Sequence, residues 1–243
     1  MATPNEHLSP DTTLADLATR HPGAIPVLEG LGLDYCCGGQ RPLGVAAAAL
    51  VLDWTQVRAY VEAAIETAPA SRVSWSEATL SELIAHILDR FHAALRVNLP
   101  LLALMGEQVV AAHGERHPEV REVASVFAGL RAELDAHMME EEHVLFPFVE
   151  QLELGLGHQH PMLGHIASPI GVKEREHEGA GALLVTLRRL TSGYAVPADA
   201  CATFRGYYDL LAKVERDLHQ HIHLENNVLF PRVVGLETRV MRA

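Results

Sequence analysis

Apolar residues recur with the period of an α-helix along most of the chain after residue 76. This periodicity predicts four long helices, each with one apolar stripe. Capping residues, glycines and prolines set the expected bounds of these helices at about 79–112, 118–153, 168–192 and 197–229. Long amphipathic helices joined by short turns pack side by side, so the pattern predicts an antiparallel four-helix bundle.

The first part of the chain carries shorter apolar patterns. They predict three helices, at about 13–21, 23–31 and 42–66. A polar, proline-containing stretch at 67–74 has the composition of a linker. We therefore expect an all-α protein with two parts, a small helical N-terminal domain over residues 1–70 and the bundle over residues 76–243.

An internal repeat is the clearest signal in the second part. The stretches His137–Pro147 and His221–Pro231 both have the pattern H-x-x-x-E-x-x-V-L-F-P. His92 and His177, on the first and third predicted helices, are separated by nearly the same interval as these two stretches. The bundle is thus predicted to consist of two similar helix hairpins, each with one lone histidine and one His-x-x-x-Glu pair.

This spacing is typical of a metal site. Residues four apart share one helix face, and both His-x-x-x-Glu pairs fall on the apolar stripe. An ionised carboxylate in a core is costly unless it is paired or bound to a metal. The predicted ligands, all facing the bundle interior, are His92, His137, Glu141, His177, His221 and Glu225.

The mixture of donors indicates iron. Imidazole suits several transition metals, carboxylate bridges favour harder ions, and glutamates shared between two ions are typical of di-iron bundles. No cysteine falls on the four stripes, which argues against a thiolate zinc site or an iron–sulfur cluster there. The expected cofactor is two non-haem irons with carboxylate or oxo bridges and positions open to small molecules.

Two adjacent cysteines, Cys36 and Cys37, precede the predicted helix that begins near residue 42. A helix N-terminus would lower the pKa of nearby thiols by stabilising the thiolate. Two interpretations stay open, a redox or metal-binding pair and two small residues in a tight turn with Gly38 and Gly39. Cys201 is expected to pack on the fourth long helix.

Composition and charge exclude some partners. The formal net charge is −12 and no Lys/Arg block is present, which disfavours nucleic acid. The longest apolar run, residues 44–52, is too short to span a bilayer, and the polar N-terminus lacks a signal-peptide core. We expect no membrane association and a cytoplasmic location. The histidines outside the ligand set are expected at the surface or behind the ligands; they include His86, His143, His158, His160, His165, His219 and His223.

These motifs resemble the hemerythrin-like, or HHE, cation-binding domain, and within it the di-iron Repair of Iron Centers family. The resemblance is carried by Asp34–Gly39, which is similar to the signature of that family's small N-terminal domain, and by Glu174–Glu178 and His221–Pro231. It implies the same six iron ligands, with Glu141 and Glu225 as bridges.

The resemblance also implies a function, the repair of iron–sulfur clusters damaged by nitrosative or oxidative stress. The expected chemistry is iron donation, nitric oxide reduction at the two irons, or both, so an oxidoreductase activity is an open question. Damaged iron–sulfur proteins, nitric oxide and oxygen, and an unidentified electron donor would be the partners. Glu133 and Glu176 would lie near the irons on a path to solvent, and Cys36 and Cys37 would have a redox role. The alternatives are a module that binds or senses oxygen or nitric oxide without turnover, and an iron reservoir.

Overall fold

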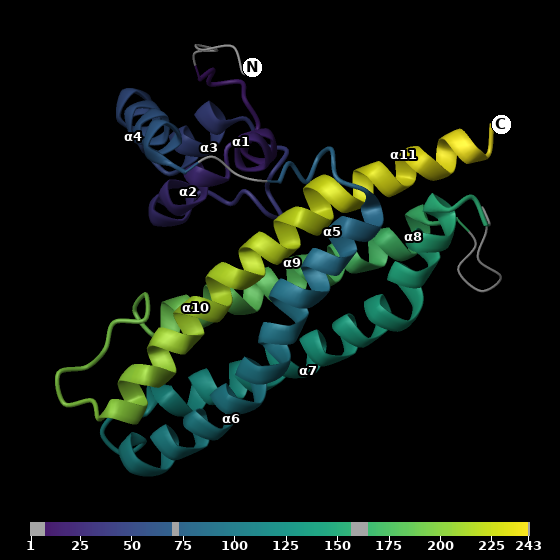
Figure 1. Cartoon of the computed structure of the whole chain (residues 1–243). Helices are drawn as coiled ribbons and strands as arrows, with labels where there is room; N and C mark the ends of the chain where they lie inside the picture. The colour runs from purple at the N-terminus through teal and green to yellow at the C-terminus, as the bar shows by residue number, and fades with distance from the viewer. Residues whose placement is uncertain (1–7, 70–72, 157–164, 243) are drawn as a thin grey trace. The chain divides into compact units, whose positions relative to one another are not determined.

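The computed structural model describes residues 8–69, 73–156 and 165–242 (Figure 1). Within these ranges every regular element is a helix, apart from one isolated bridge between Thr13 and Pro42. The all-α class expected from the periodicity is therefore confirmed. His158 and His160 lie outside the described residues.

The chain forms two compact units. The first comprises Met1–Thr79 together with Ile222–Pro231, and the second comprises Leu80–His221 with Arg232–Ala243. The first unit contains the short helices α1 (Leu14–Arg20), α2 (Ile25–Leu31), α3 (Leu43–Ala49) and α4 (Trp54–Thr67), with a 3-10 turn at Pro22–Ala24. Their apolar faces meet in a small core that includes Leu14, Leu28, Leu43 and Val61.

The expected single helix over 42–66 is wrong, because the structure divides it into α3 and α4. Val51, just after α3, adopts a φ of 57°, which ends an α-helical path. Asp53 then begins α4, and its carboxylate accepts a hydrogen bond from the Gln56 N–H at 2.9 Å. Aspartate at this position is a strong helix start, and it prevails over the alanine-rich run that precedes it.

The long helices follow after residue 79. They are α5 (Leu80–Ile87), α6 (Ala93–His113), α7 (Glu119–Glu140), α8 (Phe146–Glu153), α9 (Ala167–Leu190), α10 (Ala202–Leu224) and α11 (Phe230–Val240). In the described part of the chain, π turns at Leu88–His92, Glu141–Leu145 and Glu225–Leu229 join them into longer runs. Four long helical runs result, as the periodicity predicts, and together they form a hemerythrin-like bundle (Figure 1).

The fourth run differs from its expected bounds. It begins at Ala202 rather than at 197, and it continues past Pro231 to Val240 instead of ending near 229. Proline inside a helix normally removes a hydrogen bond and clashes with the carbonyl four residues back. Here the preceding π turn bonds the Phe230 N–H to the Glu225 carbonyl, five residues back, and the helix continues through the proline.

Apolar side chains from α6, α7, α9 and α10 fill the core of the second unit. Buried examples from each helix are Leu99, Phe127, Leu184 and Phe204. Each such side chain stabilises the fold by roughly 2 kcal/mol relative to an exposed position. The bundle is held together by this interdigitated core.

The run Leu80–His113 is long and apolar enough to cross a membrane by length and composition alone. Several of its side chains, including Leu83 and Leu95, are buried in the protein, and it also carries the buried His92. Core helices of bundles often meet the same criteria of length and hydropathy. We therefore assign this run to the bundle core.

The internal repeat extends to the ends of the helices. Glu153 on α8 caps the start of α5, where its carboxylate accepts hydrogen bonds from Leu80 N, Ser81 N and Ser81 Oγ at 2.6, 2.9 and 2.7 Å. Glu237 on α11 has the same place after the second V-L-F-P motif that Glu153 has after the first. It accepts a hydrogen bond from Ile166 N, next to the start of α9, at 2.9 Å. Each hairpin thus closes on itself through a glutamate near its end.

We expect Glu153→Gln to lower the midpoint of thermal unfolding at pH 7 by about 2–4 °C, corresponding to about 1 kcal/mol. Burial would raise the pKa of Glu153, but hydrogen bonds from Ser81 and Leu80 and the charge of Arg232 outweigh it and lower the pKa. A carboxylate whose pKa is lowered in the folded state stabilises the fold at pH values above the ordinary glutamate range. This stabilisation is lost as the pH falls through the lowered pKa. Differential scanning calorimetry should therefore show the difference between the two proteins shrinking at acidic pH.

Glu150→Gln provides the matched control for this prediction. Glu150 is exposed on the same helix, α8, so its substitution should leave the midpoint unchanged. Equal effects of the two substitutions would show that the cap contributes no specific stability.

Candidate metal centre

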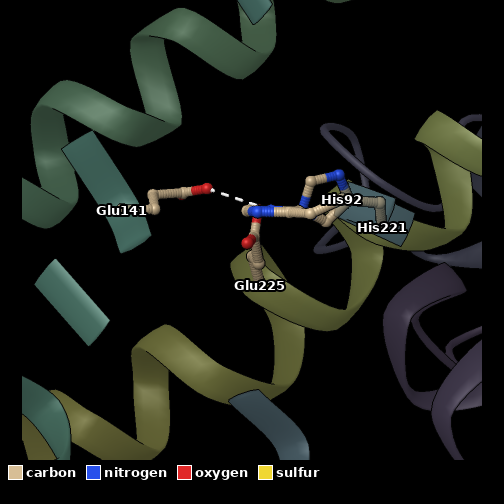
Figure 2. Close-up of side chains that lie close together, drawn as sticks. All are labelled: His92, Glu141, His221 and Glu225. Atoms are coloured by element: carbon tan, nitrogen blue, oxygen red, sulfur yellow. Dashed lines mark hydrogen bonds and ion pairs between the residues drawn. The ribbon is translucent and has the colours of Figure 1, made fainter. Parts of the chain in front are cut away.

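Six buried side chains form two groups that could each hold a metal ion. The first group is His92, Glu141, His221 and Glu225, and the second is His137, Glu141, His177 and Glu225. Within each group the ligand atoms all lie within 4.8 Å of one another. Figure 2 shows the first group, with the Glu141 carboxylate directed toward the histidine rings. The two groups share both glutamates, so two ions held here would be bridged by carboxylates.

The π turns coincide with the ligand positions. His92 is the last residue of the first π turn, and Glu141 and Glu225 open the second and third. Each π turn inserts one extra residue into the helix, which shifts the side chains on the inner face, and such turns are frequent at functional sites. The helical periodicity of the sequence does not predict these turns. The repeated V-L-F-P motif, with proline at the second position after each of the last two turns, is the signal that could have indicated them.

The imidazoles meet in pairs with Glu141 between them. Nε2 of His92 lies 3.2 Å from Nε2 of His221, and the same atoms of His137 and His177 are also 3.2 Å apart. One Glu141 oxygen lies 3.5 Å from Nε2 of His92, and the other lies 3.1 Å from Nε2 of His137. Each oxygen of this carboxylate therefore serves a different pair, which is the orientation that a bridging ligand needs.

Carboxylates behind two of the rings determine which nitrogen faces the centre. Nδ1 of His92 lies 2.8 Å from Glu142, and Nδ1 of His137 lies 2.8 Å from Glu176. An ionised carboxylate only accepts, so each Nδ1 carries the proton and the neutral ring turns the lone pair of Nε2 inward. This carboxylate–histidine arrangement is characteristic of metal ligands. The converging electron pairs of imidazole and carboxylate fit two cations such as iron.

The structure places Glu176 in contact with the metal centre and Glu133 outside it. Glu176, half-buried on α9, contacts His137 and also Lys173. Burial would raise the pKa of Glu176, but hydrogen bonds and charges of Lys173 and His137 outweigh it and lower the pKa. Glu133 is exposed on α7 and lies outside the six-residue centre, with a carboxylate oxygen 3.9 Å from where a Cβ on Gly179 would stand.

The cysteine loop of the first unit is organised by Asp34. Its carboxylate accepts hydrogen bonds from the backbone N–H groups of Cys36, Cys37 and Gly38 at 3.2, 3.0 and 2.9 Å. The two sulfur atoms are 3.9 Å apart, and neither cysteine forms a disulfide. Cys36 is buried, whereas Cys37 is partly exposed.

The expected lowering of the thiol pKa is wrong for Cys36. The thiol is hydrogen-bonded to Cys37, buried and close to the Asp34 carboxylate, and together these raise its pKa well above the ordinary value. Helix α3 begins only at Leu43, too far along the chain for its N-terminus to stabilise a thiolate on Cys36.

The same loop packs on the helical segment Ile222–Pro231, which belongs to the first unit. Asn227 Nδ2 donates hydrogen bonds to the carbonyls of Tyr35 and Cys36 at 3.2 and 2.9 Å. His223 is buried with Nδ1 3.3 Å from the Tyr35 carbonyl, and burial lowers the pKa of His223 to about 4. A neutral histidine and an amide, four residues apart on one helix face, thus hold the loop.

Other residues considered from the sequence lie away from these sites. Cys201 precedes α10 and is exposed, so its expected packing role is wrong. His143 is exposed and bonds through Nδ1 to the Met139 carbonyl at 2.8 Å. His165 is also exposed.

A helical bundle with two His/Glu groups sharing two glutamates is typical of carboxylate-bridged di-iron proteins of the hemerythrin class. Residues 83–233 match the family described as the Hemerythrin HHE cation binding domain, and residues 10–65 match a Domain of Unknown function (DUF542).

Relatives named "Iron-sulfur cluster repair protein YtfE" align over nearly the whole chain. The Edwardsiella ictaluri protein is 39% identical over 93% of this chain and 97% of its own length. The Pectobacterium carotovorum protein is 38% identical (92% and 97%), and the Cronobacter sakazakii protein is 37% identical (93% and 98%). The chain therefore belongs to the hemerythrin HHE family, in the group that contains these iron–sulfur cluster repair proteins.

We expect Glu141→Gln to lower iron retained after desalting to less than about half of the wild-type amount, because both ligand groups lose a charged donor. The metal-free variant should unfold at a higher temperature than the metal-free wild type, since a buried carboxylate without a cation destabilises the core. Iron analysis and thermal melts of both forms measure the two effects. His143→Gln, an exposed change on the same π turn, should alter neither. Unchanged iron content in Glu141→Gln would contradict the shared-ligand arrangement.

We expect Gly39→Ala to loosen the cysteine loop. A Cβ on Gly39 would lie 2.7 Å from Asn227 Oδ1 and 2.8 Å from the Tyr35 carbonyl, so the backbone would have to shift. The alkylation rate of Cys36 by a maleimide, followed by mass spectrometry, should rise about tenfold or more, as expected for a loss of about 1–3 kcal/mol. Gly30→Ala is the control, because nothing lies within 4 Å of its Cβ. Equal alkylation rates in both variants would refute the packing role of Gly39.

Proposed function

We propose that this protein helps to repair iron–sulfur clusters damaged by nitrosative or oxidative stress in the cytoplasm, by iron donation and/or nitric oxide reduction at a di-iron site. The observation that carries the proposal is the pair of buried ligand groups sharing Glu141 and Glu225. The relatives that align with this chain over nearly its full length bear the name of iron–sulfur cluster repair proteins, which supports the same role.

Six residues of this chain would hold the metal ions in this proposal. The six ligands are His92, His137, Glu141, His177, His221 and Glu225. Each ion would receive two imidazoles and two shared carboxylates, and a transition metal that accepts more donors than four keeps positions for small molecules. When bound, two ferrous ions would supply the two electrons that convert two nitric oxide molecules and two protons to nitrous oxide and water.

Residues outside the ligand set would support the chemistry. Glu176 orients His137 through their hydrogen bond. Glu133, exposed on α7, is proposed as a carboxylate at the solvent end of a path from the site. Cys36 and Cys37 are proposed as a redox pair, because both are in the thiol form and their sulfur atoms lie 3.9 Å apart. Damaged iron–sulfur proteins would be the partners, and an electron donor is needed for repeated nitric oxide reduction.

A second candidate is a module that binds or senses oxygen or nitric oxide without turnover. The burial of all six ligands favours it, since none is more than 5% exposed and only a small molecule could enter. This function needs the same metal site but neither electron delivery nor a redox role for the cysteines.

Two assays on the anaerobically reduced, iron-loaded protein separate these functions. We expect added nitric oxide to yield up to one nitrous oxide per chain, because two ferrous ions hold two transferable electrons. We also expect a nitric-oxide-damaged [4Fe–4S] hydratase to regain activity on incubation with the loaded protein, and ⁵⁷Fe to move into its cluster. An equal amount of free ferrous salt is the control for the second assay.

The outcomes are distinct. Nitric oxide that stays bound without nitrous oxide, together with no recovery of the hydratase, would support the sensing module and exclude both proposed repair activities. Cys36→Ala and Cys37→Ala should slow at least one of the two reactions, and Cys201→Ala, which changes the exposed third cysteine, should slow neither. Unaltered rates in all three variants would exclude the redox role of the pair.

A further inference from the structure

The internal repeat is broken behind the metal-binding imidazoles. His137 rests on Glu176, with Nδ1 2.8 Å from the carboxylate. Its repeat counterpart, His221, instead stacks on the Phe91 ring, with centroids 5.5 Å apart and planes at 8°. Phe91 directly precedes His92 just as Glu176 directly precedes His177, so the two residues hold equivalent positions in the two hairpins. The carboxylate behind His137 therefore belongs to the second hairpin alone.

The carboxylate behind His92 is likewise specific to one hairpin, in this case the first. His92 rests on Glu142, with Nδ1 2.8 Å from the carboxylate. Glu142 directly follows the ligand Glu141, and the residue that follows the ligand Glu225 is Asn226, a neutral amide. Each of the two ligand groups thus contains one imidazole with a carboxylate behind it, supplied from a different hairpin.

The cations paired with these two carboxylates differ in exposure. Lys173 on α9 is only 3% exposed, and its Nζ lies 2.8 Å from Glu176 and 2.7 Å from Glu140. Lys173 stands one helical turn before His177, and the residue at the same place before His92 is Leu88, so the buried ammonium is also unique to one hairpin. Burial would lower the pKa of Lys173, but the hydrogen bonds to the two carboxylates outweigh it and raise the pKa. The lysine therefore stays charged at neutral pH.

The counterpart cation behind His92 is Arg96, which forms an ion pair with Glu142. The Arg96 side chain is 54% exposed. Water and salt screen the charge of the exposed Arg96 guanidinium more than that of the buried Lys173 ammonium. We call the group containing His137 and His177 the lysine-backed position, and the group containing His92 and His221 the arginine-backed position.

We propose that Lys173 is a positioning residue for the metal site, because its buried ammonium holds the Glu176 carboxylate against Nδ1 of His137. As a result, the lysine-backed position releases its ion more slowly than the arginine-backed position does. The inference rests on the proposed di-iron function and deepens it, since it identifies the arginine-backed ion as the one that is given up first.

Loss of Lys173 is expected to speed release of the ion because Glu176 would no longer be held in place. The Glu176 side chain is 38% exposed, so a carboxylate released from Lys173 can turn toward water. His137 would then lose the acceptor that fixes its tautomer and ring orientation. Loss of such a partner typically weakens metal binding about tenfold to a hundredfold.

The test is the release of ferrous iron from the anaerobically loaded full chain to an excess of a ferrous chelator, followed by its colour. We expect two phases in the wild type, each of one ion per chain. Lys173→Met should accelerate the slow phase about tenfold or more. Arg96→Met should change either phase by less than about fivefold, as expected for an exposed ion pair. Wild-type rates in Lys173→Met, or equal effects of the two substitutions, would overturn the proposal.

A second variant separates positioning from a merely structural link between α7 and α9. Glu140→Gln removes the other partner of Lys173 and leaves Glu176 in place. It should leave the slow phase unchanged, whereas a structural link would make it as damaging as Lys173→Met. Should Lys173→Met fail to fold, Glu176→Gln is compared with the double variant of Glu176→Gln and Lys173→Met. Once Glu176 is neutral, loss of the lysine should alter release by less than about twofold, and a larger change overturns the proposal.

A metal-free measurement distinguishes failure of this inference from failure of the proposed function. In the ¹⁵N spectrum of the histidine side chains, His137 should be the Nδ1-protonated tautomer in the wild type and a mixture in Lys173→Met. A chain that retains no iron refutes the di-iron function, and the tautomer of His137 still decides the role of Lys173. An unchanged tautomer in the variant refutes that role.

Discussion

Two carboxylates buried in an apolar core are the constraint on which the structure depends. Glu141 and Glu225 are fully buried, and an ionised group there destabilises the fold unless cations offset its charge. Four imidazoles meet at the same place, and each ring can give a lone pair to a cation. The bundle therefore has a polar centre that is favourable only with metal, so that metal binding and stability are coupled.

The two hairpins supply equivalent ligands to this centre. A few residues behind the ligands differ between the hairpins. The repeat supplies two His-x-x-x-Glu pairs, two π turns followed by proline, and two glutamates that close the hairpins. The groups behind the imidazoles differ, with a buried lysine on one side and an exposed arginine on the other. A site whose ligands are symmetric is in this way given unequal surroundings at its two positions, which would suit the proposed donation of iron.

The first unit adds a cysteine pair with its own constraints. Asp34 holds the loop from within, and Asn227 and His223 hold it from the helical segment that follows the His221 position. The raised pKa of Cys36 keeps this thiol protonated at neutral pH, which makes it a poor nucleophile.

The sequence alone determined the helical class and the six converging residues, because the period of an α-helix and the repetition of H-x-x-x-E-x-x-V-L-F-P depend only on local geometry. Tertiary structure decided the remainder. The π turns, the helix that continues through Pro231, the cap from Glu153 and the contact of Lys173 with Glu176 depend on how the helices pack together. No local pattern encodes such contacts, since they arise when packing closes the bundle and buried polar groups must find partners.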